Sequence, residues 1–171
     1  MTRRVVADTT ITPTATGDGA NLVDNTYPCV VQGGSTTQRN GIWEVYCGGQ
    51  TAATSSPTYM ILGMDSQVGT GSNTRGSGQT DAPMDSLAAA LAAPVLTGNQ
   101  FATNKPQRSS TLHLINMAFN TYGGISKWQA YDSEGRVLIY GNAANVGEVS
   151  LSAFTGGTTG AMGFHLIYET I

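Results

Sequence analysis

The sequence carries little charge, because Asp, Glu, Lys and Arg make up only 11% of its 171 residues. Soluble domains usually contain about 25% of these residues. The net charge is -3, and the only basic cluster is the pair Arg3 and Arg4, which we expect in a solvated arm. Several Lys or Arg residues on one face are needed to neutralise phosphates, so the composition argues against nucleic-acid binding.

Cysteine and long apolar runs are also scarce. Cys29 and Cys47 are the only cysteines, and the opening stretch "MTRRVVADTT" has no apolar segment that could act as a signal peptide. We therefore expect two buried free thiols rather than a secreted disulfide scaffold, although a bridge across neighbouring strands stays open. No run of 18 apolar residues occurs, so the sequence predicts no membrane span and no membrane partner.

Signatures of metal binding and nucleophilic catalysis are missing. The two histidines, His113 and His165, each lie among apolar residues, and the chain contains no HxH, HxxxH or CxxC motif. Structural or interface roles are therefore expected for both histidines. The serines form no G-x-S-x-G elbow. The sequence predicts no enzyme, no catalytic residues, no cofactor and no metal site.

Acidic residues give only weak signals. A glycosidase needs two carboxyl groups about 5 to 10 Å apart. The candidates, which stand out only because acidic residues are few, are Glu44, Glu134, Glu148 and Glu169. The loop "TGDGANLVDN" contains Asp18, Asn21, Asp24 and Asn25, but it lacks the spacing and the closing Glu of a calcium-binding EF-hand. A turn-rich loop explains this stretch equally well.

Small polar residues replace the missing charge. Gly, Thr and Ser together supply about a third of the chain, and hydrophobic residues supply 40%. Threonine favours strands and glycine favours turns, so this composition is typical of an all-β protein. We expect a single domain over residues 1–171, folded as a β-sandwich that is jelly-roll-like.

Short segments with alternating or continuous apolar residues predict eight to ten strands. The clearest are "NGIWEVYCGG", "PTYMILGM", "STLHLINMAFN" and "VGEVSLSAF". The stretch "ISKWQAYDSEGRVLIYGN" predicts a hairpin with its turn at Asp132 to Gly135. Other segments depart from this pattern. Residues 1–12 begin with a short β-prone run and are expected as a strand or an extended N-terminal arm. Residues 66–82 are expected as a flexible loop, and about 85–93 as one short helix ended by Pro94.

The aromatic residues raise the question of carbohydrate binding. Trp43 and Tyr46 lie three apart, as do Trp128 and Tyr131, and residues three apart face opposite sides of an ideal strand. This parity favours core packing of the tryptophans over an aromatic platform for sugars. A lectin-like module remains the alternative function.

The C-terminal stretch "SAFTGGTTGAMGFHLIYETI" resolves another ambiguity. A phosphate-binding loop would need a Lys and a following helix, and neither is present. The larger apolar side chains share one parity, which predicts a half-buried final strand with an inward face. These residues are Met162, Phe164, Leu166 and Tyr168. Gly156, Gly157 and Gly160 are then turn residues, and Gly163 marks a bulge or a close approach by another backbone.

Several strands are apolar on both sides, as in "TYMILGM" and "RVLIYG", which leaves a face for a partner to cover. Four features of the chain can be compared with known families: the start "MTRRVV", the Thr/Gly/Ser-rich loops, the Ala-rich "SLAAALAAP" and the strand-rich stretch "KWQAYDSEGRVLIYGNAANVGEVSLSAFTGGTTGAMG". In these features the chain resembles, in overall style, the capsid decoration, or cement, proteins of tailed bacteriophages.

The resemblance implies a small β-fold that forms a homotrimer at local three-fold axes and clamps adjacent major capsid protein subunits. It places the protein on the virion surface after synthesis in the bacterial host cytoplasm. It also implies an extended terminal arm, for which residues 2–10 are available. The expected interface residues are Thr2, Arg3, Arg4, Val5, Gly163 and His165. A phage tail or fibre component is a further alternative.

Overall fold

The computed structural model describes residues 3–13, 27–33, 39–51, 56–71, 73–75, 80–85, 87, 97–98, 100–140, 147–155 and 160–171. Within these residues the chain forms strands and turns and contains no helix. The strands are β1 (Arg3–Ile11), β2 (Cys29–Gln32), β3 (Arg39–Thr51), β4 (Pro57–Gln67), β5 (Asn73–Thr74), β6 (Thr80–Pro83), β7 (Thr97–Gly98), β8 (Gln100–Phe101), β9 (Gln107–Asn120), β10 (Ile125–Gln129), β11 (Val137–Tyr140), β12 (Glu148–Thr155) and β13 (Ala161–Thr170).

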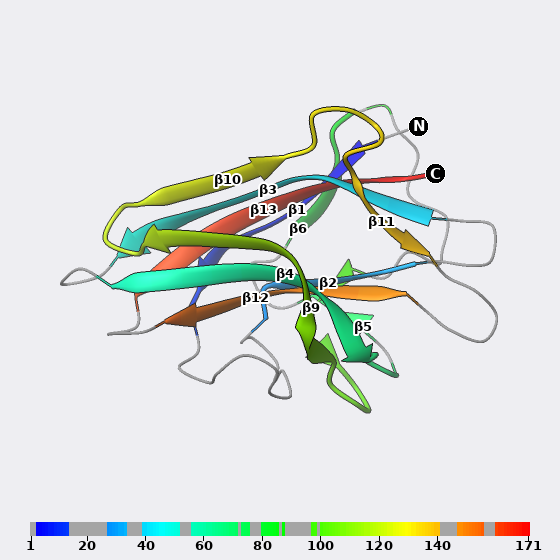
Figure 1. The fold of residues 1–171 in the computed structure, drawn as a ribbon, viewed down its shortest axis with the longest axis horizontal. Helices are drawn as coiled ribbons and strands as arrows, with labels where there is room; N and C mark the ends of the chain where they lie inside the picture. The colour runs from blue at the N-terminus through cyan, green and yellow to red at the C-terminus, as the bar shows by residue number, and fades with distance from the viewer. Residues whose placement is uncertain are drawn as a thin grey trace.

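The strands build two antiparallel sheets that pack face to face as a sandwich (Figure 1). Sheet A has the order β10-β3-β13-β1-β6, with β11 also paired to β3, and sheet B has the order β7-β2-β12-β4-β9. The strands β1, β2, β3 and β4 alternate between sheets A and B, and β9, β10, β12 and β13 alternate between sheets B and A. β1 pairs with β13 near both described ends of the chain. This wrapping is the strand order of a jelly roll, so the expected all-β sandwich is confirmed.

The core lies between the two sheets. Sheet A contributes the inward side chains of β13, and all four predicted residues, Met162, Phe164, Leu166 and Tyr168, are at most 4% exposed. Sheet B contributes apolar side chains of β4, β9 and β12 to the same cluster. Cys29 and Cys47 are buried there as free thiols, as predicted, and burial raises the pKa of the Cys47 thiol to about 12.

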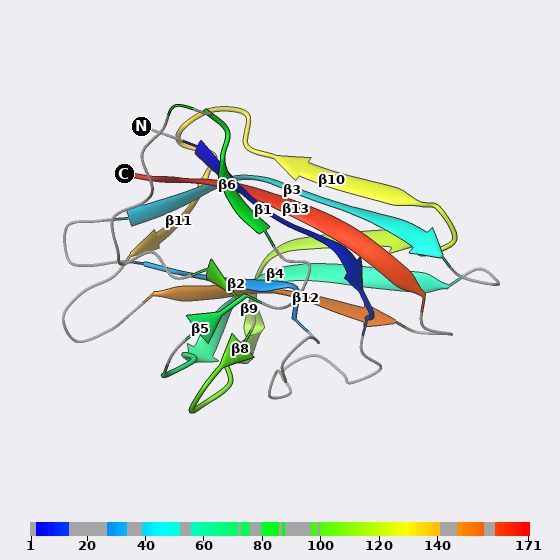
Figure 2. The ribbon, with the colours of Figure 1, turned by 180° about the vertical axis from the view of Figure 1, so that it is seen from behind.

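A second, smaller layer covers part of the outer side of sheet B. Strands β5 and β8 pair with each other and lie on the side of sheet B that faces away from sheet A (Figure 2). Phe101 of β8 packs with Tyr27 and Val30 in a separate buried cluster. The end of β4 continues into this layer, where Gly69 lies so close to the Phe101 ring that a Cβ atom would come within 2.4 Å of it.

The N-terminal segment takes the strand form of the two that were expected and is not an extended arm in its described residues. Residues 3–11 form β1, which is hydrogen-bonded to β13 on one side and to β6 on the other. The segment 66–82 is also more ordered than a flexible loop in its described parts, because β4 extends to Gln67 and β6 begins at Thr80. The predicted helix at 85–93 lies outside the described residues except for Asp85 and Leu87, which are a bend and a turn.

The predicted hairpin at 125–142 does not form between its own strands. Both β10 and β11 pair with β3 instead. They lie one after the other along the same edge of β3, so β11 continues the line of β10. The backbone N–H of Ala130 donates to the Trp43 carbonyl at 2.8 Å, which keeps the chain on β3 before it leaves for the turn. The turn itself is as expected, because Asp132 Oδ1 accepts hydrogen bonds from the backbone N–H groups of Glu134 and Gly135.

Candidate functional site

The outer face of sheet A is formed by the side chains that alternate with the core residues. One row across the sheet consists of Ala7, His165, Tyr46 and Lys127, which are paired in register through β1, β13, β3 and β10. The next row consists of Val5, Ile167, Glu44 and Gln129. The residues between these rows, such as Val6, Leu166 and Val45, are fully buried in the core. This face is therefore mixed, because small or apolar side chains such as Ala7, Val5 and Ile167 alternate with polar ones.

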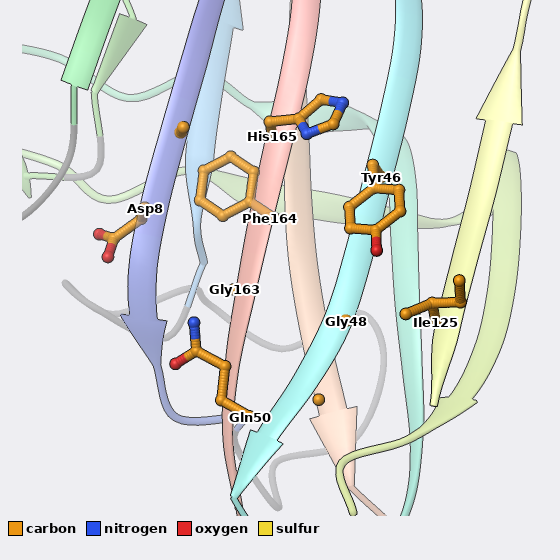
Figure 3. A pocket seen from close by; sticks show the side chains of 10 residues that line it. Asp8, Tyr46, Gly48, Gln50, Ile125, Gly163, Phe164 and His165 are labelled. Atoms are coloured by element: carbon orange, nitrogen blue, oxygen red, sulfur yellow. The ribbon is translucent and has the colours of Figure 1, made fainter. Parts of the chain in front are cut away.

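A hollow of about 330 Å³ opens on this face where two paired glycines, Gly163 and Gly48, expose the backbone (Figure 3). The rim includes Tyr46, His165 and Gln50. A Cβ atom at Gly163 would come within 2.9 Å of Gln50 Nε2 and 3.3 Å of the Asp8 carbonyl oxygen. The expected close approach at Gly163 is therefore present, and the absence of side chains keeps the floor of the hollow flat.

Charged groups beside the hollow neutralise one another. His165 Nε2 lies 2.6 Å from Glu44 Oε1, and Lys127 Nζ lies 2.9 Å from Glu44 Oε2. Burial alone would raise the pKa of Glu44, but the hydrogen bonds from His165 and Lys127 lower it below its usual value. The His165 ring also stacks on Tyr46, with the ring centroids 5.0 Å apart and the planes 5° apart. This array fixes the imidazole and leaves no unpaired charge at the centre of the face.

A second group of paired charges lies at the other end of sheet A. Arg3 and Arg136 both form ion pairs with Glu169, and both guanidinium groups lie within 5.0 Å of the centre of the Trp43 ring. Trp43 is the extra residue of a β-bulge, because Ile167 pairs with Glu44 and the next residue, Tyr168, pairs with Ile42. The bulge breaks the two-residue alternation from which opposite faces were predicted for Trp43 and Tyr46.

The tryptophans are thus held by residues of the chain itself. The guanidinium groups of Arg3 and Arg136 contact the Trp43 ring, and Trp128 packs against the core cluster. Neither presents an open platform for a sugar. Tyr46 and Phe164 are the tyrosine and phenylalanine that line the hollow, and the Tyr46 ring stacks on His165 (Figure 3).

The strand register brings four of the expected interface residues to one face. Arg3, Val5, Gly163 and His165 share the outer parity of sheet A. Arg4 has the opposite parity, and it is only 9% exposed because its Nε donates to Asp81 Oδ1 at 2.9 Å. Thr2 lies outside the described residues. The sequence therefore located part of this face, but it did not identify the glycine-floored hollow or the pairing of Glu44 with His165.

The other candidates are dispersed. His113 lies on β9 of sheet B, so the two histidines belong to different sheets. Glu134 is exposed in a turn, whereas Glu148 is 2% exposed. The acidic and amide residues of the predicted loop at 16–25 lie outside the described residues, as do Gly156 and Gly157. In the described segments, no three His, Cys, Asp or Glu residues gather closely enough to hold a metal ion.

A buried carboxyl pair on sheet B was not apparent from the sequence. Glu148 forms a hydrogen bond with Asp65, accepts another from the side-chain amide of Gln32, and accepts the backbone N–H of Gly69 at 3.0 Å. Ser150 Oγ lies 2.5 Å from Asp65 Oδ1. Asp65 follows an apolar strand segment and Glu148 begins another, so no local pattern signals that they meet. The pair fixes Gly69, and with it the outer layer, to sheet B.

A buried arginine lies next to this pair. The Arg108 side chain is 1% exposed, and its guanidinium lies 4.6 Å from the centre of the Phe154 ring. Burial, and then the neighbouring Glu148, raise the pKa of Asp65 to about 9, whereas Ser150 and Arg108 act in the opposite direction. Burial also raises the pKa of Glu148. The cluster therefore keeps a proton at neutral pH.

Two further findings complete the description. In the part of the chain that the structure describes, no helix has the length and apolar character needed to cross a membrane. In comparisons with protein-family models, curated proteins and solved structures, no match to this chain was found.

Proposed function

We propose that this protein is a structural component of a phage virion that binds the outer surface of the capsid as a homotrimer and stabilises the expanded shell. The observation that carries the proposal is the outer face of sheet A. It combines small and apolar side chains with charges that are already paired, in the array around Glu44 and the group around Glu169. Such a face can be covered by protein without leaving a charge unpaired.

We propose a capsid shell as the partner because the sequence resembles tailed-phage decoration proteins. On a shell, many copies stand close together, and a low density of charge limits repulsion between neighbours. A protein that binds the intact shell but not its separated subunits lowers the free energy of the intact state. A trimer that contacts several capsid subunits at once gains further from its high effective concentration. No catalytic step is required for this function.

The first test is a measurement of mass and of shell binding. Light scattering is expected to give about three times the chain mass of 17.8 kDa. Cosedimentation with expanded shells stripped of accessory proteins, prepared from the phage that encodes the chain, is expected to show saturable binding. Bound copies should also raise the temperature at which the shells come apart. A protein that neither oligomerises nor binds these shells would contradict the proposal.

Carbohydrate binding is the second candidate, and the position of Tyr46 beside the glycine-floored hollow favours it. A glycan screen distinguishes the two functions. A lectin-like module would show saturable binding that is lost in Tyr46→Ala, whereas a decoration protein should show none. A tail or fibre component would form elongated assemblies without affinity for shells.

A further inference from the structure

The outer layer is joined to sheet B by buried polar contacts around Gly69 (Figure 2). The backbone N–H of Gly69 donates to both carboxylate oxygens of Glu148, at 3.0 and 3.1 Å. The side-chain amide of Gln32 donates to Glu148 and to the Gly69 carbonyl. Glu148 is also hydrogen-bonded to Asp65. We call these four residues the latch, since they connect β2, β4 and β12 to the segment that leads into the outer layer.

The contact between the two carboxyl groups of the latch requires a proton. A carboxylate oxygen only accepts hydrogen bonds, so two carboxyl groups can bond to each other only when one of them is protonated. Without that proton, two negative charges would lie in contact in the interior, which is unfavourable. Burial and the adjacent Glu148 raise the pKa of Asp65 to about 9, as expected for two carboxyl groups that share one proton.

Among the described elements, β9 brings positive charge to the pair. Arg108 of this strand acts on Asp65 and favours its charged form, and His113 is the other titratable side chain on the strand. β2 and β12 contribute the uncharged side chains of Gln32 and Ser150. Lys105, beside the outer layer, is hydrogen-bonded to the carbonyl of the last residue of β8. Arg108 can therefore balance one carboxylate of the pair but not two.

The end of β4 is the part of the latch that can move. Asp65 is half-buried, whereas Glu148 is 2% exposed at the start of β12. The pairing of β4 with β9 shifts register on both sides of Asp65, between Gly63 and Asp65 and again between Asp65 and Gln67. Such shifts interrupt the ladder of hydrogen bonds. Repulsion between the carboxyl groups is therefore relieved most easily by displacing residues 65–69.

We propose that the latch is a pH-sensitive switch, which releases the outer layer from sheet B when the carboxyl pair loses its shared proton. In the released form Gly69 leaves Glu148 and the Phe101 ring, and the cluster of Tyr27, Val30 and Phe101 becomes accessible to solvent. The two-sheet core stays folded, because it is held by its own apolar cluster. The switch lies within one chain and needs neither the trimer nor the shell, so its failure would leave the proposed function untouched.

Amide exchange measured by NMR tests the switch. The exchange rate of the Gly69 N–H in the unaltered protein is divided by that in Asp65→Asn at the same pH, which removes the intrinsic effect of pH on exchange. Once released, Asp65 titrates near its ordinary pKa of about 3.9. Because the closed form binds a proton that the released form has lost, the ratio is expected to rise by up to about tenfold per pH unit between pH 7 and pH 9.

The N–H of Leu166 reports on the core, because β13 lies in the middle of sheet A. At pH 9 the Gly69 N–H should exchange at least about tenfold faster than the Leu166 N–H, since the outer layer opens without the core. Slow exchange at Leu166 also establishes that each variant is folded. Equal protection at the two sites would mean that Gly69 is released only by global unfolding, and that result would overturn the proposal.

Two further variants complete the test. Glu148→Gln alters the other member of the pair, and its carbonyl can still accept the Gly69 N–H, so it should weaken the pH dependence as Asp65→Asn does. Asp132→Asn is the matched control in an exposed turn, and it should keep the pH dependence of the unaltered protein. A Gly69 ratio that stays constant from pH 7 to pH 9 would show that release does not involve the proton of the pair, and the switch would be excluded.

Discussion

The Asp65→Asn variant is expected to lose less stability from pH 6 to pH 9 than the unaltered protein, which becomes less stable across this range. In the native protein, burial and the adjacent Glu148 raise the pKa of Asp65 to about 9. In the unfolded chain this carboxyl group titrates near its ordinary pKa of about 3.9. The folded state therefore binds a proton that the unfolded state has released.

The sign follows from this difference in bound protons. A folded-state pKa above the unfolded value contributes stability that is complete below about pH 4 and is lost as the pH rises through about 9. For one proton the loss is at most about 1.4 kcal/mol per pH unit. Asparagine needs no proton, since its carbonyl can accept from Ser150 and its amide can donate to Glu148. The cluster then holds a single carboxylate next to Arg108.

Urea unfolding at several pH values measures this effect. Asp132→Asn is the matched control, because Asp132 is exposed in the β10–β11 turn and an Asn can accept the same backbone hydrogen bonds. This control should retain the pH dependence of the unaltered protein. If Asp65→Asn showed the same loss of stability at alkaline pH as the control, the shared proton would not be the cause.

The sequence predicted the parts of the fold that depend on local alternation. In β13 the large side chains of Met162, Phe164, Leu166 and Tyr168 all face the core, because each has the same parity and nothing interrupts the strand there. The same reasoning located β3, β4, β9 and β12, since each is a run of residues that favour strands. One-sided burial is a property of neighbouring residues, so it can be read from a single segment.

Strand pairing was beyond local reasoning. β10 and β11 were expected to pair with each other, but β3 offers an edge long enough to bind both in succession. The bulge at Trp43 lies in the pairing of β13 with β3, and it moves Trp43 out of the alternation on which its predicted face depended. The sequence left open whether the N-terminal segment is a strand or an extended arm, and its place between β13 and β6 depends on pairing with distant segments.

In the candidate site, too, the features of a single strand could be predicted, whereas the contacts between strands could not. Residues on one strand, such as Gly163 and His165, could be assigned to a face from their spacing. The partners that complete the site, Glu44 and Tyr46, come from another strand, and the register that joins them was not available from the sequence. The Asp65–Glu148 pair could not be predicted from the sequence, because its two members are far apart in the chain. Their protonation could not be predicted either, because burial, not residue type, raises both pKa values.

Two adjacent glycines give the prediction with the largest effect on folding. A Cβ atom at Gly49 would lie 2.4 Å from three backbone atoms of Thr121, including Cα, C and O. Thr121 is fully buried, and its backbone N–H is hydrogen-bonded to Ser56, so this segment cannot move aside cheaply. Gly49 also donates its N–H to the Gly124 carbonyl at 2.8 Å, which ties β3 to the same turn. Gly49→Ala is therefore expected to destabilise the protein by about 3 kcal/mol or more.

Gly48→Ala is the matched control, since it makes the same change one residue earlier. A Cβ atom there would lie 3.4 Å from Ile125 and 3.7 Å from Tyr46, which are ordinary contacts on the floor of the hollow. Alanine also restricts the unfolded chain, a gain of about 0.4 to 1 kcal/mol where the native backbone tolerates it. We therefore expect Gly48→Ala to unfold within about 1 kcal/mol of the unaltered protein in urea. Equal losses in the two variants would show that β3 requires glycine for its conformation rather than for its approach to Thr121.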